Sequence, residues 1–137
     1  NEAIASVKQI IKPLEQNNMN LTLETSLGIF NAKEFIKRVG SNCLKINFDF
    51  GNSCCLGEDT PATIKSLGSL IGGVHIKDRT RLLGTTVPLG EGDVDFDQCF
   101  DAIKNINYQG VLILQACRGV DDVATAKNYL SFVRTFL

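Results

Sequence analysis

Four short strand-like segments alternate with amphipathic helical segments along this chain, and this alternation limits the possible folds more than any other feature. The strand-like segments are residues 21–25, 44–50, 74–78 and 111–117. Helical segments precede, separate and follow them, which gives the order α-β-α-β-α-β-α-β-α. Strands that alternate with helices form crossovers between parallel strands. The sequence therefore predicts an α/β fold with one parallel sheet.

The predicted helix ends rest on capping signals. Asn31, with Glu34 three residues later, has the spacing of a capping box at a helix start. Thr60 stands directly before a proline, as an N-cap residue often does. Gly72 and Gly73 are expected to end the helix that begins there.

Two of the strand-like segments place polar residues on one face and apolar residues on the other. The polar face carries Lys45, Asn47, Asp49, His75 and Lys77. A sheet covered by helices on both faces would bury this polar row, whereas the inner face of a (β/α)8 barrel collects polar groups near its top. A complete barrel needs about 250 residues. The 137 residues with four strands therefore predict a single domain, residues 1–137, that forms half of such a barrel.

Composition argues against several classes of partner and compartment. The net charge is −1, so no overall basic field indicates nucleic acid. No apolar run approaches the roughly 20 residues of a membrane span. The five cysteines include no CxxC pair, which is typical of a reducing compartment. We expect a cytoplasmic protein that binds neither nucleic acid nor membrane.

One polar side chain stands near the end of each predicted strand: Glu24, Asp49, His75 and Gln115. Parallel strands end at the same edge of a sheet, so these four side chains should converge. Glu, Asp and His bind divalent ions such as Mn²⁺, Zn²⁺, Co²⁺ and Mg²⁺, and a glutamine can offer an amide oxygen. The pattern predicts a divalent metal site. The alternative is that these residues are solvated strand ends or hydrogen-bond partners within a lumen.

Further polar residues lie close to this predicted site. Asn52 follows the second strand and could bond a substrate hydroxyl, or could simply serve the turn. Lys77 belongs to the same strand face as His75. Arg79 and Arg81 begin the next loop and could neutralise an anionic substrate, or could be ordinary surface charges. We predict Asn52, Lys77 and Arg81 as substrate-binding residues.

Three motifs in order resemble those of the xylose isomerase-like TIM barrels. They are residues 49–52 (DFGN), 74–78 (VHIKD) and 88–96 (PLGEGDVDF). Within that family the resemblance is to the sugar-phosphate isomerase and epimerase branch, of the L-ribulose-5-phosphate 3-epimerase or hexulose-6-phosphate isomerase type. It covers nearly the whole chain and implies the C-terminal half of a (β/α)8 TIM barrel.

The resemblance also implies roles for the four strand-end residues. In the family two Glu, one Asp and one His bind the metal, and the two Glu exchange the substrate proton. Glu24 takes the place of the first Glu, Asp49 of the Asp and His75 of the His. The second Glu falls on Gln115, which departs from the pattern and has no titratable proton. The catalytic positions implied are thus Glu24 and Gln115.

Three functions follow as hypotheses. The first is a metal-dependent sugar or sugar-phosphate isomerase or epimerase that works through an enediolate. The second is an inactive half-barrel that serves as an assembly or binding module, since Gln115 replaces an acid and strands are missing. The third is metal-dependent DNA repair of the endonuclease IV type, but that family uses several histidines and this chain has one. We expect the chain to pair with an N-terminal half-barrel, or with itself.

Overall fold

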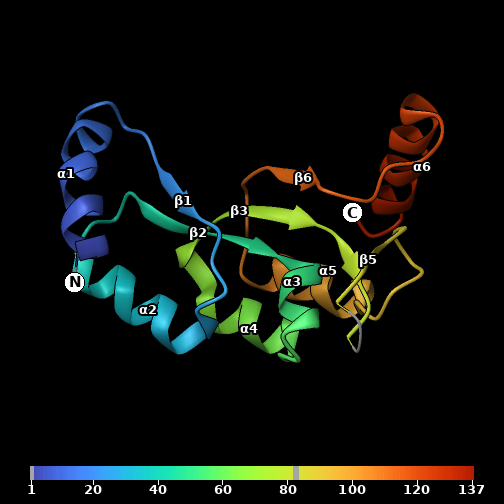
Figure 1. Cartoon of the computed structure of the whole chain (residues 1–137), viewed down its shortest axis with the longest axis horizontal. Coiled ribbons are helices and arrows are strands. Elements are labelled where there is room, and N and C mark those ends of the chain that lie inside the picture. The colour runs from blue at the N-terminus through green and yellow to red at the C-terminus, as the bar shows by residue number, and fades with distance from the viewer. Residues whose placement is uncertain (1, 82–83) are drawn as a thin grey trace.

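A computed structural model describes residues 2–81 and 84–137 of the chain. Its main sheet has four strands, all parallel, in the order β1-β2-β3-β6. They are β1 (Leu21–Leu23), β2 (Leu44–Asp49), β3 (Ile71–Ile76) and β6 (Leu112–Leu114). The spatial order repeats the chain order without the switch point of a doubly wound sheet. The predicted parallel sheet is confirmed, and its order is that of neighbouring strands in a barrel (Figure 1).

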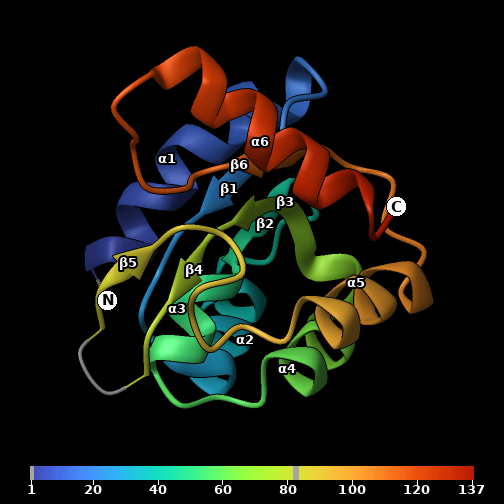
Figure 2. The same cartoon turned by 90° about the vertical axis from the view of Figure 1, so that its right-hand side faces the viewer.

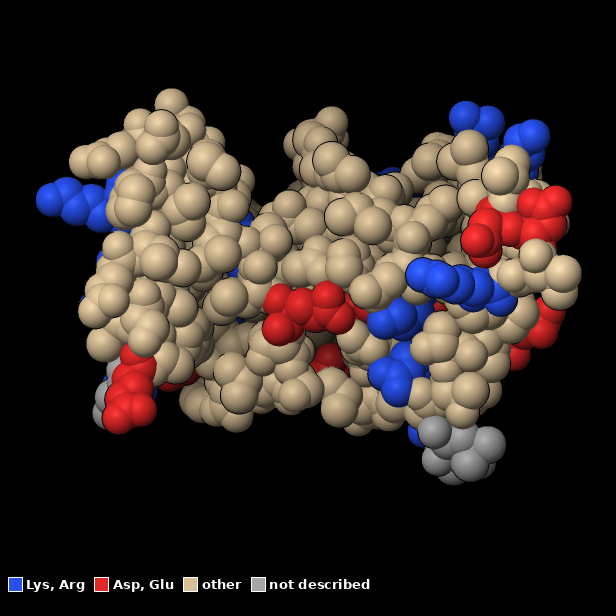
Figure 3. Space-filling view, turned by 45° about the horizontal axis from the view of Figure 1, so that its top comes forward, with Lys and Arg blue, Asp and Glu red and all other residues tan. Residues whose placement is uncertain are grey.

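The helices pack against one face of this curved sheet and leave its other face open. In Figures 1 and 2, α2 (Gly28–Val39), α4 (Thr60–Leu67) and α5 (Phe96–Asn105) lie below the strands. The other two, α1 (Glu2–Gln16) and α6 (Asp122–Arg134), rise above opposite ends of the sheet. A hollow remains between them in the space-filling view (Figure 3).

Aromatic rings pack the residue that directly follows β2 against α5, and α5 against α6. Phe50 is fully buried, and its ring centroid lies 5.7 Å from that of Phe100 in α5. Phe96 packs edge-on against Phe132 of α6, with centroids 5.1 Å apart. Such edge-to-face pairs contribute beyond the apolar area that they bury. This cluster fixes the chain segment directly after β2, and so the place where the polar strand ends converge.

A β-bulge sets the register between β2 and β3. Ile46 pairs with Ile71, but the next residue, Asn47, pairs with Gly73, so Gly72 is an extra residue in β3. As a result, Asp49 lies opposite His75. Without the extra residue, His75 would be displaced by one position, and its side chain would point to the other face.

The two glycines at the bulge show where the predicted helix end was wrong. Gly72 and Gly73 lie inside β3, and the helix before them ends at Leu67, followed by the 3-10 turn η1 (Gly68–Leu70). A Cβ on Gly73 would lie 2.5 Å from Asn47 Oδ1, and one on Gly72 would lie 2.5 Å from Lys45 Cβ. Close approach of the two strands, not helix termination, requires glycine here.

Two predicted N-caps also differ from the structure. α2 begins at Gly28, one turn before Asn31, whose side-chain amide donates to Leu27 O. α4 is capped by Asp59 in place of Thr60, since Asp59 Oδ1 accepts from the Ala62 N–H. The N-cap of α2 is Leu27, which provides no side-chain cap, whereas α4 uses the first of two adjacent capping residues.

Some elements were not predicted. A short helix, α3 (Phe50–Cys55), starts directly at the end of β2, and an antiparallel pair, β4 (Asp78–Arg79) with β5 (Thr86–Val87), follows β3. The fully buried Asp78 carboxylate accepts three backbone N–H groups, from Gly90, Gly92 and Val94. It therefore anchors the segment after β5 against the end of β3. In the described residues, every helix is too short or too polar to cross a membrane.

Candidate metal centre

Three ligand-type side chains meet at the carboxyl end of the sheet. Glu24 directly follows β1, Asp49 ends β2, and His75 lies near the end of β3. One ligand atom from each lies within 4.8 Å of the others. Acidic side chains are visible in the hollow between the two raised helices (Figure 3). The three residues come together because their strands are parallel neighbours and the bulge puts His75 opposite Asp49.

The atoms that face one another in this cluster have the character of metal ligands. His75 Nδ1 lies 3.3 Å from Glu24 Oε2 and 3.9 Å from Asp49 Oδ2. Asp49 is 4% exposed. Both Asp49 Oδ2 and His75 Nδ1 are buried without a hydrogen-bond partner. Buried polar atoms usually have a hydrogen-bond partner. Here the nearest charged groups are Glu24 Oε2 for His75 Nδ1 and Lys77 Nζ for Asp49 Oδ2, and a cation bound among the three ligand-type residues would satisfy both atoms.

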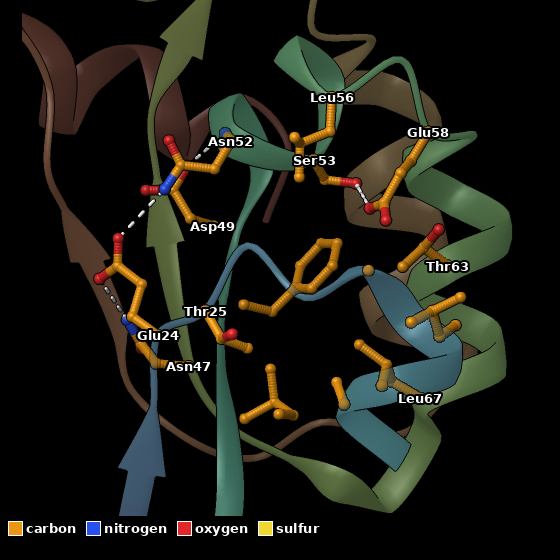
Figure 4. A pocket seen from close by; sticks show the side chains of 15 residues that line it. Glu24, Thr25, Asn47, Asp49, Asn52, Ser53, Leu56, Glu58, Thr63 and Leu67 are labelled. Carbon is orange, nitrogen blue, oxygen red and sulfur yellow. Dashed lines mark hydrogen bonds between the residues drawn. The ribbon is translucent and has the colours of Figure 1, made fainter. Parts of the chain in front are cut away.

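Two asparagines hold the Glu24 carboxylate in place (Figure 4). The Asn47 amide donates to Glu24 Oε2 over 3.3 Å, and the Asn52 amide donates to Glu24 Oε1 over 3.1 Å. Asn52 also fixes the second carboxylate, because its backbone N–H donates to Asp49 Oδ1 over 2.7 Å as the first turn of α3 begins. Asn47 further contacts His75 Nε2 at 3.0 Å. Each of the three ligand-type residues therefore has an asparagine neighbour that restricts its orientation.

Lys77 was predicted to contact substrate, and the structure places it at the ligand cluster itself. Its Nζ lies 3.1 Å from Asp49 Oδ2, as an ion pair. Its side chain is largely buried. The ammonium thus offsets part of the negative charge that Glu24 and Asp49 bring to the site.

Gln115 lies at the same edge of the sheet but outside this contact set. It is exposed and directly follows β6, where its backbone N–H donates to Ile76 O over 3.0 Å. The register of β3 and β6, continued by one residue, sets Gln115 beside Lys77. Among the described residues its side chain forms no hydrogen bond. Its role as a fourth ligand remains a prediction.

The two arginines that follow β3 lie in different surroundings. Arg81 lines a depression of about 400 Å³ with Cys54, Asp93 and other polar residues, and this depression does not include Glu24, Asp49 or His75. A hydrogen bond with the Cys54 side chain raises the pKa of the Arg81 guanidinium. Arg79, by contrast, donates to Asn52 Oδ1 over 2.8 Å. The sequence holds only a partial signal for this, because the period-two face of His75 and Lys77 continues through both Arg79 and Arg81.

Glu24 borders two hollows. One is a depression of about 340 Å³, within the range of small-molecule sites. Its lining residues are Glu24, Thr25, Ser26, Asn52, Cys55, Leu56 and Arg79. The other is a cavity of about 50 Å³ that Glu24 also lines, where Ser53 Oγ donates to Glu58 Oε2 (Figure 4). Sequence reasoning missed Thr25 and Ser26, because hydroxyl residues after a strand are too common to indicate a site.

Comparison with known proteins adds a family to this geometry. The family model described as Xylose isomerase-like TIM barrel matches residues 1–135. L-ribulose-5-phosphate 3-epimerase UlaE of Salmonella typhi is 29% identical over 87 residues, which are 64% of this chain and 31% of that protein. Putative L-ribulose-5-phosphate 3-epimerase SgbU of Escherichia coli is 30% identical over 89 residues, 61% of this chain and 31% of that protein. Each match thus covers about a third of the curated relative.

Solved structures show the fold. D-allulose 3-epimerase from Methylomonas sp. superposes with a TM-score of 0.84 at 19% identity, over 98% of this chain and 54% of that one. A structure of L-ribulose 3-epimerase gives a TM-score of 0.81 at 22% identity, over 98% of this chain and 52% of that one. This chain therefore spans about half the length of these barrels. The prediction of parallel β/α units forming half of a (β/α)8 barrel is confirmed.

Proposed function

This chain belongs to the Xylose isomerase-like TIM barrel family, and on that basis we propose that it is the C-terminal half of a metal-dependent sugar or sugar-phosphate isomerase or epimerase. In this proposal residues 1–137 are one half-barrel domain, and the rest of the barrel completes the substrate pocket. The relatives and neighbours that carry sugar-epimerase names support the substrate class.

One observation carries the proposal: the ligand atoms of Glu24, Asp49 and His75 lie within 4.8 Å of one another, and Asp49 Oδ2 and His75 Nδ1 are buried and make no hydrogen bond. Carboxylate oxygens and an imidazole nitrogen suit Mn²⁺, Zn²⁺, Co²⁺ or Mg²⁺. A divalent ion held there would polarise a substrate carbonyl and the adjacent hydroxyl. It would thereby acidify the proton on the carbon that carries this hydroxyl, next to the carbonyl.

The chain's own residues would then handle that proton. Glu24 is the carboxylate that borders the 340 Å³ depression, and we assign it as the base. Asn52 lines the same depression and orients Glu24. Lys77 supplies a cation beside Asp49 that would stabilise negative charge developing on a substrate oxygen.

The glutamine at position 115 restricts the reaction. Epimerisation needs two acid–base groups on opposite faces of the carbon, whereas aldose–ketose isomerisation can use one group that removes and returns the proton on a single face. Gln115 cannot exchange a proton. Unless the other half of the barrel provides an acid, this chain would labilise the substrate proton without inverting the carbon.

Metal binding is the first test. Isothermal titration with Mn²⁺ should show one site, with a melting temperature that rises with Mn²⁺ concentration, because a ligand of the native state stabilises it. His75→Ala should lose both effects. Asn128→Ala, an exposed position in α6, is the matched control and should keep them. If the wild-type chain shows no Mn²⁺-dependent shift, the metal part of the proposal is wrong.

The second test separates proton removal from inversion. NMR of a ketose phosphate in D₂O with Mn²⁺ should show exchange of the proton next to the carbonyl, and Glu24→Gln should abolish the exchange. Gln115→Glu should add inversion at that carbon. If the wild-type chain binds Mn²⁺ but exchanges no proton with any ketose or ketose phosphate, the chemistry assigned to Glu24 fails.

A second function is favoured by the apolar surface of the open face. Ile113 pairs with His75 across β3 and β6, so their side chains share a face, and Ile113 is 44% exposed. β1 and β6 also leave their outer backbone groups without a strand partner in the described sheet. A half-barrel that binds another half through these edges, without catalysis, would have these features. Native mass spectrometry that finds only monomers would count against it.

A further inference from the structure

We infer that Arg79 is a positioning residue for the proposed metal centre, acting on Glu24 through the side-chain amide of Asn52; the metal part of this inference rests on the proposed function. Arg79 belongs to β4, a two-residue strand outside the main sheet. Within the part of the chain that the structure describes, no hydrogen bond or ion pair joins Arg79 directly to Glu24, Asp49 or His75. The connection runs through hydrogen bonds in one direction.

Each link in this connection has only one possible donor. The Arg79 guanidinium can only donate, and its Nη1 donates to Asn52 Oδ1 over 2.8 Å. The Glu24 carboxylate can only accept, and it accepts from Asn52 Nδ2 over 3.1 Å. The amide therefore has one orientation that satisfies both neighbours. Without the arginine, a rotated Asn52 could turn its oxygen toward Glu24 and repel the carboxylate.

The guanidinium is itself held from the other side. Arg79 Nε donates to Gly84 O over 2.7 Å, and Nη2 donates to the same carbonyl. Two glycines leave room for the Arg79 side chain. A Cβ on Gly51 would lie 3.0 Å from Arg79 Cγ, and a Cβ on Gly84 would lie 3.2 Å from Arg79 Nη2. The planar fork, with donors to two different oxygens, is a geometry that lysine cannot reproduce.

Asn52 donates hydrogen bonds to two of the three ligand-type residues, Glu24 and Asp49. Its side chain holds Glu24 and its backbone N–H holds Asp49 Oδ1 over 2.7 Å. A shift of Asn52 would therefore disturb two ligands at once. Groups that orient metal ligands in this way typically change metal affinity by about 10-fold to 100-fold when removed.

The test is a double-mutant cycle on Mn²⁺ affinity, with Arg79→Lys and Asn52→Ala made singly and together. We expect Arg79→Lys to raise the Kd by about 10-fold, and to change it by less than about twofold in the Asn52→Ala background, because the route to Glu24 is then already absent. Arg134→Lys, an exposed arginine at the end of α6, is the matched control and should leave the Kd unchanged.

A metal-free measurement keeps the inference testable if the wild-type chain does not bind Mn²⁺. The two Asn52 side-chain amide protons should give separate, shifted NMR signals in the wild type. In Arg79→Lys these signals should move toward the values of a free amide, while the backbone spectrum of the sheet is retained. Unchanged Asn52 amide signals overturn the inference. An equal Kd change from Arg79→Lys with and without the Asn52 side chain overturns it as well.

Discussion

Replacing Asp78 by asparagine tests the anchor that holds the segment after β5. The wild-type carboxylate is fully buried, and its Oδ2 accepts from Gly90 and Gly92, both over 2.9 Å, while Oδ1 accepts from Val94 over 3.3 Å. In Asp78→Asn one oxygen can still accept two of these bonds, but as a neutral group. The amide nitrogen then faces the third N–H, so two donors meet without an acceptor.

The cost follows from these three bonds. A hydrogen bond to a charged group contributes about 1.5–3 kcal/mol, and one to a neutral group about 1 kcal/mol, so two weakened bonds lose about 2 kcal/mol. The unsatisfied N–H of Val94 adds about 1–3 kcal/mol. Because the variant no longer buries a charge, part of this loss is offset. We expect Asp78→Asn to lower the free energy of unfolding by about 3 kcal/mol.

Urea unfolding followed by circular dichroism measures this loss. With a slope of about 2 kcal/mol per molar urea, the midpoint should fall by about 1.5 M. Asp101→Asn, an exposed position in α5, is the control and should change the free energy of unfolding by less than about 0.5 kcal/mol. A midpoint for Asp78→Asn within about 0.3 M of the wild type would show that the carboxylate does not anchor this segment.

Three further predictions concern packing and ionisation. Gly51→Ala should lower the free energy of unfolding by about 1–3 kcal/mol in urea titrations, because the new Cβ would lie 2.9 Å from Lys77 Cγ. A urea midpoint equal to that of the wild type would show that α3 can shift at no cost. Phe50→Ala should cost about 3–5 kcal/mol in the same assay, whereas Phe30→Ala, at a position that is 78% exposed, should cost far less; equal losses would refute the assigned core. Burial raises the pKa of the Cys99 thiol from 9.0 to about 12, so the unfolded chain ionises first and stability should fall between pH 9 and 12. Cys99→Ala should reduce that loss in urea midpoints taken at pH 8 and 10, and an unchanged pH dependence would contradict it.

The fold class could be predicted from the sequence because its signals are local. The strict alternation of residues 44–50 fixes both the strand and its two faces. Strands separated by amphipathic helices leave parallel pairing as the natural arrangement. These patterns need no knowledge of which strand lies beside which.

Element boundaries could be predicted less well, since neighbouring residues compete for the same role. Asp59 and Thr60 are both good N-caps, and the structure uses Asp59. Gly72 and Gly73 have the composition of a helix end, yet they lie in β3 against the side chains of Lys45 and Asn47. A glycine in a sequence indicates either a close contact that excludes a side chain or a backbone conformation that other residues avoid. Only the tertiary structure shows which of the two applies.

In the candidate site, too, some residues could be predicted from the sequence and others could not. Its ligand-type residues, Glu24, Asp49 and His75, were visible in the sequence because each follows or ends a strand whose direction was predictable. The separation of the two arginines was not: Arg79 contacts Asn52, whereas Arg81 lines another depression. Two residues apart in the chain, they differ in surroundings because β4 pairs with β5 at Arg79 and the chain then turns.

The sequence by itself determined that this protein forms parallel β/α units with polar strand ends at one edge. The tertiary structure alone decided the register in which those ends meet. A single extra residue, Gly72, shifts β3 against β2 and sets His75 opposite Asp49. The physical reason is that periodicity records how a residue faces its own strand, while register depends on the fit between two strands that are distant in the chain.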